Sequence, residues 1–232
     1  MDALPNVNVA TSSMISSGLT PTAIPQAKSA EKGVSVEYVP AADKHWYVLR
    51  ASYGRELLAE ELLIQQNVYA YVAKQYKYKE VNGKPKRVLE NLISNLVFAY
   101  LSRQEALMFV NNNLTDQASP SPQLATFLSF YYNHFEEGEF WRNPPLTVPE
   151  SEMLNFIRAT STHDENLLVL QGGDFHYKSD DEVEVICGQF QGVRGRVVRA
   201  RGQQRVLVKL TGLNCLCATA YIPSAFLQKI TP

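Results

Sequence analysis

The chain has 232 residues, of which 45% are hydrophobic, a length and composition typical of a globular protein with one large or two small domains. Its formal net charge is −1, from 22 basic and 23 acidic side chains, so any affinity for nucleic acid must come from a local patch and not from the charge of the whole protein. No stretch approaches the roughly 18 uncharged apolar residues of a membrane-spanning helix, which argues against that class of protein.

Export and metal binding are also disfavoured by the sequence. The N-terminus lacks the basic and apolar regions of a secretory leader. Three cysteines, Cys187, Cys215 and Cys217, are too few and too unevenly spaced for a disulfide framework or a four-ligand zinc site. In a strand Cys215 and Cys217 would share one face, and we expect these two to pack in the core. We therefore expect a cytoplasmic protein with no metal and no other cofactor.

The N-terminal segment differs in composition from the rest. Residues 1–43 are rich in Ser, Thr, Ala and Pro, and no apolar period runs through them. Such a segment buries too little apolar surface to offset the entropy of ordering it, so we predict a disordered tail over these residues. A partner-binding arm is the alternative.

Ordered structure should begin near Lys44. Residues 45–50 are apolar enough for a buried strand, and residues 51–54 form a turn. Leucines at helical spacing then predict an amphipathic helix over residues 55–66, and β-branched and aromatic side chains predict a second strand over residues 68–72.

A basic hairpin is predicted next. Asn82-Gly83 lies between two extended arms, which is the strongest short hairpin signal that a sequence offers. Two tyrosines, Tyr76 and Tyr78, alternate with lysines, an arrangement that suits contacts to phosphates together with packing on a sugar or base. The alternative is a solvated hairpin that only protects a sheet edge from aggregation. Residues 74–87 carry the single acid Glu80 and the basic residues Lys74, Lys77, Lys79, Lys84, Lys86 and Arg87.

The next two elements are a strand and a helix. Residues 88–100 have strand character, and their last five are so uniformly apolar that both faces should be covered, one by helices and the other by a partner. Ser102 and Glu105 have the spacing of a capping box, which predicts a helix to about Val110.

Aromatic residues then predict another strand over residues 124–135, followed by a turn at residues 136–139. Thr147 and Glu150 form a second capping box, which predicts a helix to about Thr160 with a buried apolar stripe. Residues 166–170 would close the sheet as a short strand.

Closely spaced glycines mark the C-terminal part. Alternating valines between Asp181 and Val198 predict strands with one buried face, and Gly188, Gly192 and Gly195 lie between them. Glycine adopts positive φ, or lets two backbones approach without a Cβ, so these glycines predict a sharply bent loop.

This stretch resembles the KOW motif, which marks a small SH3-like barrel in transcription and ribosomal proteins. The family usually has Gly before the aspartate and Pro after the first glycine, where this chain has Asp180 and Gln189. Neither exchange removes a glycine of the bend. The resemblance is carried by Asp181, Val183, Val185, Gly188, Phe190, Gly192, Gly195 and Val197.

The preceding part is similar to the N-terminal domain of the NusG family, the NGN domain. In that family the domain is followed by a linker and one KOW barrel, the same order as here. The resemblance implies an α+β protein: an antiparallel sheet flanked by helices over residues 44–170, a linker over 171–179 and an SH3-like KOW β-barrel over 180–232. The similarity is carried by Trp46–Leu49, Ser52–Glu56, the basic hairpin, Leu92–Tyr100 and the helix after Val148.

Some features are similar to the specialised NusG paralogues that antiterminate long bacterial polysaccharide operons. The family commonly has Pro-Gly-Tyr where this chain has Ser94-Asn95-Leu96, and residues 120–145 form a longer segment than a housekeeping member needs. Together with Pro145–Pro149 and Asn155–Arg158, these features imply an antitermination factor for specific operons.

The resemblance also implies partners. Family members bind RNA polymerase, gripping the clamp of its largest subunit, and suppress pausing or termination; the apolar docking positions match Tyr53, Ile93, Leu96 and Phe98. The basic hairpin would lie toward upstream or non-template DNA. The barrel, with Gly188, Phe190, Gly192 and Gly195 as its motif, would recruit a ribosomal protein or termination factor, and we expect a monomer.

Two other hypotheses stay open. In the first, the chain is an RNA-binding or ribosome-associated KOW protein that acts without polymerase. In the second, it is a polymerase-free structural adaptor in which the lysine hairpin is dispensable. Catalysis is not expected, because no phosphate loop, dinucleotide fingerprint or nucleophile elbow occurs in the sequence. The histidines, His45, His134, His163 and His176, also lack metal-ligand spacing.

Overall fold

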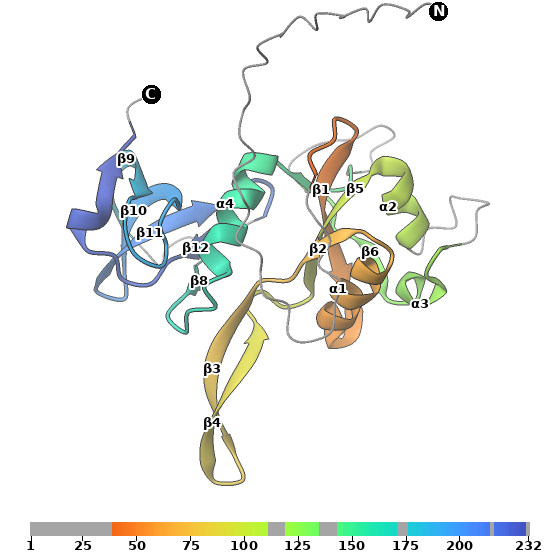
Figure 1. Cartoon of the computed structure of the whole chain (residues 1–232), viewed down its shortest axis with the longest axis horizontal. Coiled ribbons are helices and arrows are strands. Elements are labelled where there is room, and N and C mark those ends of the chain that lie inside the picture. The colour runs from red at the N-terminus through yellow and green to blue at the C-terminus, as the bar shows by residue number, and fades with distance from the viewer. Residues whose placement is uncertain (1–38, 111–118, 135–142, 171–175, 214–215, 231–232) are drawn as a thin grey trace, which may run out of the picture.

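The computed structural model describes residues 39–110, 119–134, 143–170, 176–213 and 216–230 (Figure 1). Within these ranges the protein is α+β, with antiparallel sheets and few helices. Apart from residues 39–43, the predicted tail lies outside the described residues, as do the turn predicted at 136–139 and Cys215.

The first sheet has five antiparallel strands. The central strand β1 (Lys44–Ala51) pairs with β5 (Leu96–Ser102), β6 (Leu128–Phe130) and β7 (Thr147–Val148). On the far side of β5 lies β2 (Tyr69–Tyr71). The strands predicted at residues 45–50 and 68–72 are confirmed.

Three helices cover one face of this sheet: α1 (Glu56–Gln65), α2 (Arg103–Phe109) and α3 (Pro122–Ala125). The capping box of α2 is confirmed. The Glu105 backbone N–H donates to Ser102 Oγ at 3.2 Å, and the Ser102 N–H donates to Glu105 Oε2 at 2.7 Å.

The opposite face of the first sheet is also buried, as predicted, but the chain covers it with its own residues. Alternate β5 side chains, among them Phe98, pack toward α4 (Glu150–Thr160) and the second sheet, while their neighbours face the three helices. The Phe98 and Phe156 ring centroids lie 5.5 Å apart. The expected partner on this face is therefore replaced by a helix that lies later in the chain.

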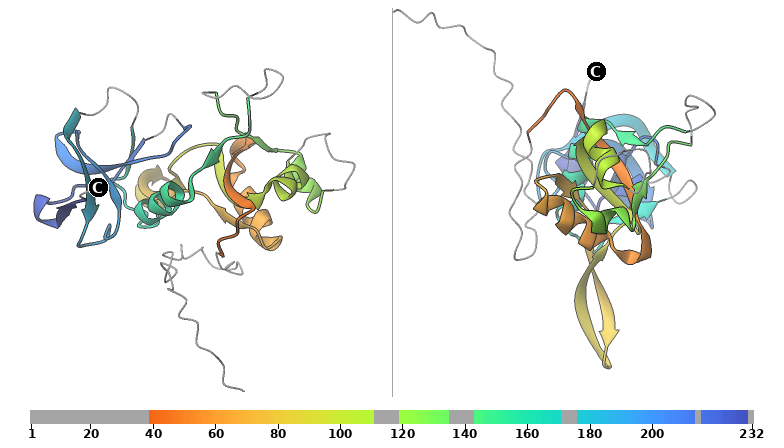
Figure 2. Two further views of the ribbon diagram at one scale, coloured as in Figure 1. Left: turned by 90° about the horizontal axis from the view of Figure 1, so that it is seen from above. Right: turned by 90° about the vertical axis from the view of Figure 1, so that its right-hand side faces the viewer.

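The basic hairpin is confirmed. It consists of β3 (Lys74–Val81) and β4 (Lys84–Asn91), paired only with each other, and it projects away from the body (Figures 1 and 2). Asn82 and Gly83 both have positive φ, 54° and 73°, the conformation that a two-residue hairpin turn requires.

Six strands form the second sheet. Its order is β13 (Leu227–Lys229), β9 (His176–Val185), β10 (Arg194–Ala200), β11 (Gln203–Lys209), β12 (Leu216–Ala218) and β8 (Leu168–Leu170). Within the described residues β13 and β8 stand at opposite ends of this order and do not pair, so the closed barrel is not confirmed. A short 3₁₀ turn, Ser224–Phe226, precedes β13.

The strand β8 corrects one prediction. We assigned residues 166–170 to the first sheet, but β8 pairs with β12 in the second sheet. Likewise β9 begins at His176, inside the predicted linker 171–179. The sequence of a short edge strand does not show which strand it will pair with, so tertiary packing decides the sheet that it joins.

Three local predictions were also wrong in part. The region 88–100 is two strands separated by a turn in which Asn95 has φ 63°. Within the described part of the predicted strand 124–135, residues 128–130 form β6 and Tyr132 makes one isolated bridge with Pro145, whereas the start of the segment belongs to α3. The capping box at Thr147 does not form. Thr147 lies in β7 and pairs with Tyr47 of β1, and α4 begins after Pro149 without a side-chain cap. The end of α4 at Thr160 and its buried apolar stripe are confirmed.

The helix α4 lies between the two sheets and joins them (Figures 1 and 2). One continuous apolar cluster contains Trp46 and Phe98 from the first sheet, Phe156 from α4, and Val206 and Val208 from β11. Both halves of the described chain thus share one core. No helix in the described ranges has the length and apolarity needed to cross a membrane.

Candidate functional site

The first predicted docking residue, Tyr53, is the most exposed large hydrophobic side chain among those described, at 84%. It lies in the 3₁₀ turn η1 (Ser52–Gly54) with φ 64° and ψ 28°, a left-handed conformation that aromatic residues rarely adopt. The Arg55 guanidinium carbon lies 5.5 Å from the Tyr53 ring centroid and 5.3 Å from that of Phe127. Arg55 therefore braces the exposed ring against the body of the domain.

A buried carboxylate joins this turn to the turn before β5. Glu56, only 2% exposed, accepts a hydrogen bond from the Asn95 backbone N–H at 2.5 Å. The Ala51 N–H donates to the Asn95 carbonyl at 3.0 Å. The loop that carries Tyr53 is therefore fixed beside the turn that follows Ile93.

The other three predicted docking residues lie deeper. Ile93 is half-buried and packs against the core, whereas Leu96 is 8% exposed and Phe98 is 1% exposed. Leu96 and Phe98 are core residues in this structure, so among the four predicted docking residues Tyr53 is exposed and Ile93 is partly exposed.

The hairpin gathers the predicted nucleic-acid contacts, although two of its lysines are neutralised. Lys74 pairs with Glu60 at 2.5 Å, and Lys79 pairs with Glu90. In the described part of the chain no carboxylate forms an ion pair with the other three lysines, Lys77, Lys84 and Lys86. The root of the hairpin is anchored, because the Tyr76 N–H donates to the His163 carbonyl at 3.1 Å.

The glycine-rich bend has the geometry predicted for it. Gly188 and Gly192 have φ 83° and 82°, and a Cβ on Gly195 would lie 2.1 Å from the Leu207 carbonyl oxygen. The Phe190 side chain is buried in the shared core. These residues therefore shape and anchor a loop.

A polar seam, defined as Glu152, Asn155 and Arg158 of α4, joins the helix to the second sheet. Glu152 accepts hydrogen bonds from the Thr211 N–H and hydroxyl, both at 2.7 Å. Asn155 exchanges two bonds with the Arg194 backbone, and Arg158 donates to the Gly192 carbonyl at 2.9 Å. Sequence reasoning missed this role, although the three-residue spacing places the side chains on one face of the helix.

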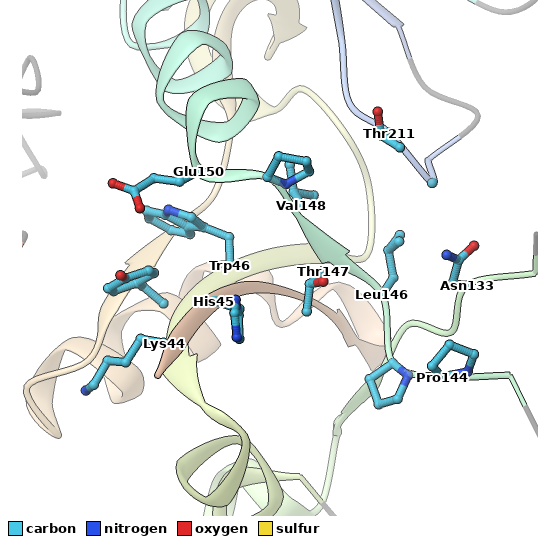
Figure 3. A pocket seen from close by; sticks show the side chains of 14 residues that line it. Lys44, His45, Trp46, Asn133, Pro144, Leu146, Thr147, Val148, Glu150 and Thr211 are labelled. Carbon is cyan, nitrogen blue, oxygen red and sulfur yellow. The ribbon is translucent and has the colours of Figure 1, made fainter. Parts of the chain in front are cut away.

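A cavity of about 470 Å³ opens beside this seam (Figure 3). Its walls come from β1, the segment 144–150 and the loop of Thr211, so it lies where the two halves meet. Among the residues that line it, Lys44 pairs with Glu105 at 2.9 Å. Nowhere in the described ranges do three His, Cys, Asp or Glu residues gather as a metal site would require.

Two buried groups have shifted ionisation. Burial raises the pKa of Tyr71, whose hydroxyl lies 2.6 Å from Thr160 Oγ1. Burial also lowers the pKa of Arg205, which donates to the Asn166 and Thr219 carbonyls, both at 2.7 Å. Both groups fasten elements together, since Arg205 joins the segment before β8 to the end of β12.

Comparison with known proteins gives one family. Residues 44–157 match the NusG family, described as transcription termination factor nusG. No curated protein gives a significant match to the chain. The matched range begins at the first residue of β1 and ends within α4, so it contains the first sheet, its helices and the hairpin. Residues 44–157, just under half of the chain, are therefore similar to the NusG family.

Proposed function

We propose that the chain is a transcription elongation factor that binds RNA polymerase and suppresses pausing or termination. The observation that carries the proposal is the exposed ring of Tyr53 within the residues that are similar to the NusG family. An aromatic side chain held on a constrained loop at the surface has the character of an interface hot spot, because little entropy is lost when it is buried by a partner.

The docking surface in this proposal is the Tyr53 loop with the adjoining turn at Ile93. Glu56 holds the two loops in a fixed relation through Asn95. The partner surface is the clamp of the largest polymerase subunit, as the family resemblance implies. Leu96 and Phe98 support this surface from the core, so their substitution would act through folding.

The hairpin contributes a nucleic-acid contact to the same complex, toward upstream or non-template DNA. Its exposed lysines provide a local positive field on a chain whose net charge is −1. The second sheet, with its glycine-rich bend, acts in this proposal as a KOW module that recruits a ribosomal protein or termination factor. The site of action is the cytoplasm, at specific long operons.

A transcription assay tests the proposal. Core RNA polymerase from the same cell is halted on a template with a defined pause site and released with or without the full chain. We expect shorter pauses with the chain and a smaller effect with Ile93→Asp. Unchanged pausing with the wild-type chain would contradict the proposal.

The second candidate function is RNA or ribosome binding without polymerase, which the exposed lysines of the hairpin favour. Genome-wide occupancy separates the two. A polymerase-bound factor is found on transcribed DNA, and an operon-specific factor is found on few transcription units. A ribosome-associated protein sediments with ribosomes and leaves transcribed DNA unoccupied.

A further inference from the structure

We propose that the β3–β4 hairpin binds an unpaired nucleic-acid strand, stacking a base on Tyr78 while lysines on its opposite face hold the phosphates of the same strand. The inference rests on the hairpin role in the proposed function and assigns the class of nucleic acid and the residue that contacts a base. It is drawn from the register of the two strands.

The two faces of the hairpin carry different chemistry. In an antiparallel pair, successive residues point to opposite faces and directly paired residues share a face. The pairs Tyr76 with Leu89 and Tyr78 with Arg87 therefore lie on one face, which we call the tyrosine face. The opposite lysine face carries Lys77, Lys79, Lys84 and Lys86, with Glu90 as its acid.

The lysine face concentrates positive charge. Lys79 and Lys86 are direct cross-strand partners, and although Glu90 pairs with Lys79, the like charges of Lys86 and its lysine neighbours repel one another. Lys77, Lys84 and Lys86 are all exposed, and no described carboxylate forms an ion pair with them. A polyanion such as a phosphate backbone removes this repulsion when it binds.

The tyrosine face has one ring already covered and one ring open. The Arg87 guanidinium carbon lies 3.8 Å from the Tyr76 ring centroid, so the two groups stack on each other. Tyr78, the direct partner of Arg87, is 64% exposed. Arg87 is thus held beside an open aromatic ring, and a base that stacks on Tyr78 has a cation at its edge.

Neighbouring rungs of the ladder place the two kinds of contact close together. The Tyr78–Arg87 pair lies next to the Lys79–Lys86 pair, about 3.4 Å along the strand, but on the other face. A ligand that touches both must lie on both sides of a two-stranded ribbon. A groove of duplex DNA can reach both sides with its phosphates, but its bases are stacked inside and offer no face to Tyr78, whereas an unpaired strand meets both requirements.

Fluorescence anisotropy with the full chain tests the inference without polymerase. The probes are a labelled single-stranded DNA, a single-stranded RNA of the same sequence and the corresponding duplex, each titrated at several salt concentrations. We expect at least one single strand to bind more tightly than the duplex, and the DNA and RNA arms show which sugar is preferred.

Matched variants assign the contacts. Tyr78→Ala should weaken single-strand binding roughly 5- to 150-fold, whereas Tyr78→Phe, which keeps the ring, should bind like the wild type. Lys86→Ala should lower the slope of log affinity against log salt by about 0.7 if it loses one phosphate contact. Tyr221→Ala and Lys209→Ala, exposed positions in or beside the second sheet, are the controls.

Duplex binding as tight as single-strand binding would overturn the inference, as would unchanged affinity in Tyr78→Ala. Loss of binding in Tyr78→Phe equal to that in Tyr78→Ala would also overturn it, because the hydroxyl and not the ring would then matter. Absence of binding to every oligonucleotide would remove the nucleic-acid role of the hairpin. None of these outcomes affects polymerase docking, which the pausing assay with Ile93→Asp tests separately.

Discussion

Asn155 of α4 exchanges two hydrogen bonds with the backbone of Arg194 in β10. The Asn155 side-chain amide donates to the Arg194 carbonyl at 2.6 Å, and the Arg194 N–H donates to Asn155 Oδ1 at 2.8 Å. The Asn155 side chain thereby pairs with the Arg194 backbone as a neighbouring strand would, at the first residue of β10. The two sheets are joined by directional contacts as well as by a common apolar core.

Replacing Asn155 with Ala should lower the free energy of unfolding by about 1–3 kcal/mol, because two hydrogen bonds at about 0.5–1.5 kcal/mol each are lost. Chemical denaturation of the full chain measures this change. Hydrogen exchange at the Arg194 amide should become faster in the same variant, since its acceptor is gone.

Asn155→Asp provides the matched control. It keeps an oxygen acceptor for the Arg194 N–H but removes the donor to the carbonyl, so its loss of stability should be intermediate. If hydrogen exchange at the Arg194 amide were as slow in Asn155→Ala as in the wild type, the hydrogen bonds between Asn155 and Arg194 would not be what holds α4 to β10.

Gly195 is required for a different reason from the other glycines of the bend. Its Cβ would lie 2.1 Å from the Leu207 carbonyl oxygen, a backbone atom that cannot move aside without breaking the β10–β11 ladder. Gly195→Ala should therefore lower the free energy of unfolding by about 3 kcal/mol or more.

Gly202→Ala is the comparison for this variant. Gly202 has φ 76° but open space around it, so Ala there should cost only the strain of a left-handed residue, about 1–2 kcal/mol. Thermal unfolding of both variants measures the difference. If the two variants were equally destabilised, the backbone around Gly195 and Leu207 would have moved apart at little cost, and the close approach would not be what requires glycine.

Glu105 makes part of the stability dependent on pH. Burial raises its pKa, but hydrogen bonds from Lys44 and Ser102 outweigh that effect, and the net pKa is lowered. A carboxyl group with a lowered folded pKa contributes stability that is present above its unfolded pKa and is lost as pH falls through the folded pKa. The wild type should thus lose this contribution as the solution becomes more acidic than about pH 4.5.

Glu105→Gln should remove that component of the acid dependence, because glutamine does not titrate. Denaturation midpoints measured between about pH 7 and pH 3 give the two profiles. Glu61→Gln, on α1, controls for the loss of one negative charge. A Glu105→Gln profile that matched the wild type at every pH would contradict the role assigned to this carboxylate.

Local patterns in the sequence predicted the elements that local interactions decide. The Asn82-Gly83 turn has the backbone angles that its residues favour, and the Ser102–Glu105 box caps α2 as its spacing required. The buried stripe of α4 followed from the helical period of Met153, Phe156 and Ile157. In each case the information lay within a few residues.

Non-local pairing explains the features that were missed. Thr147 has the spacing of a capping residue, but pairing with β1 takes precedence, and β8 joins the second sheet because β12 offers it an edge. The docking residues were predicted from resemblance, and alternation in β5 puts Leu96 and Phe98 on the face that α4 covers. Only the arrangement of the whole chain shows that this face is occupied.

The affinity of core RNA polymerase for the wild-type chain and for Tyr53→Ala tests the central claim most directly. Because Tyr53 is 84% exposed, its truncation should leave the free energy of unfolding nearly unchanged. We predict that the chain binds polymerase and that Tyr53→Ala weakens binding by about tenfold or more, whereas Tyr221→Ala does not. Failure of the wild-type chain to bind polymerase, or equal binding by Tyr53→Ala, would contradict the account.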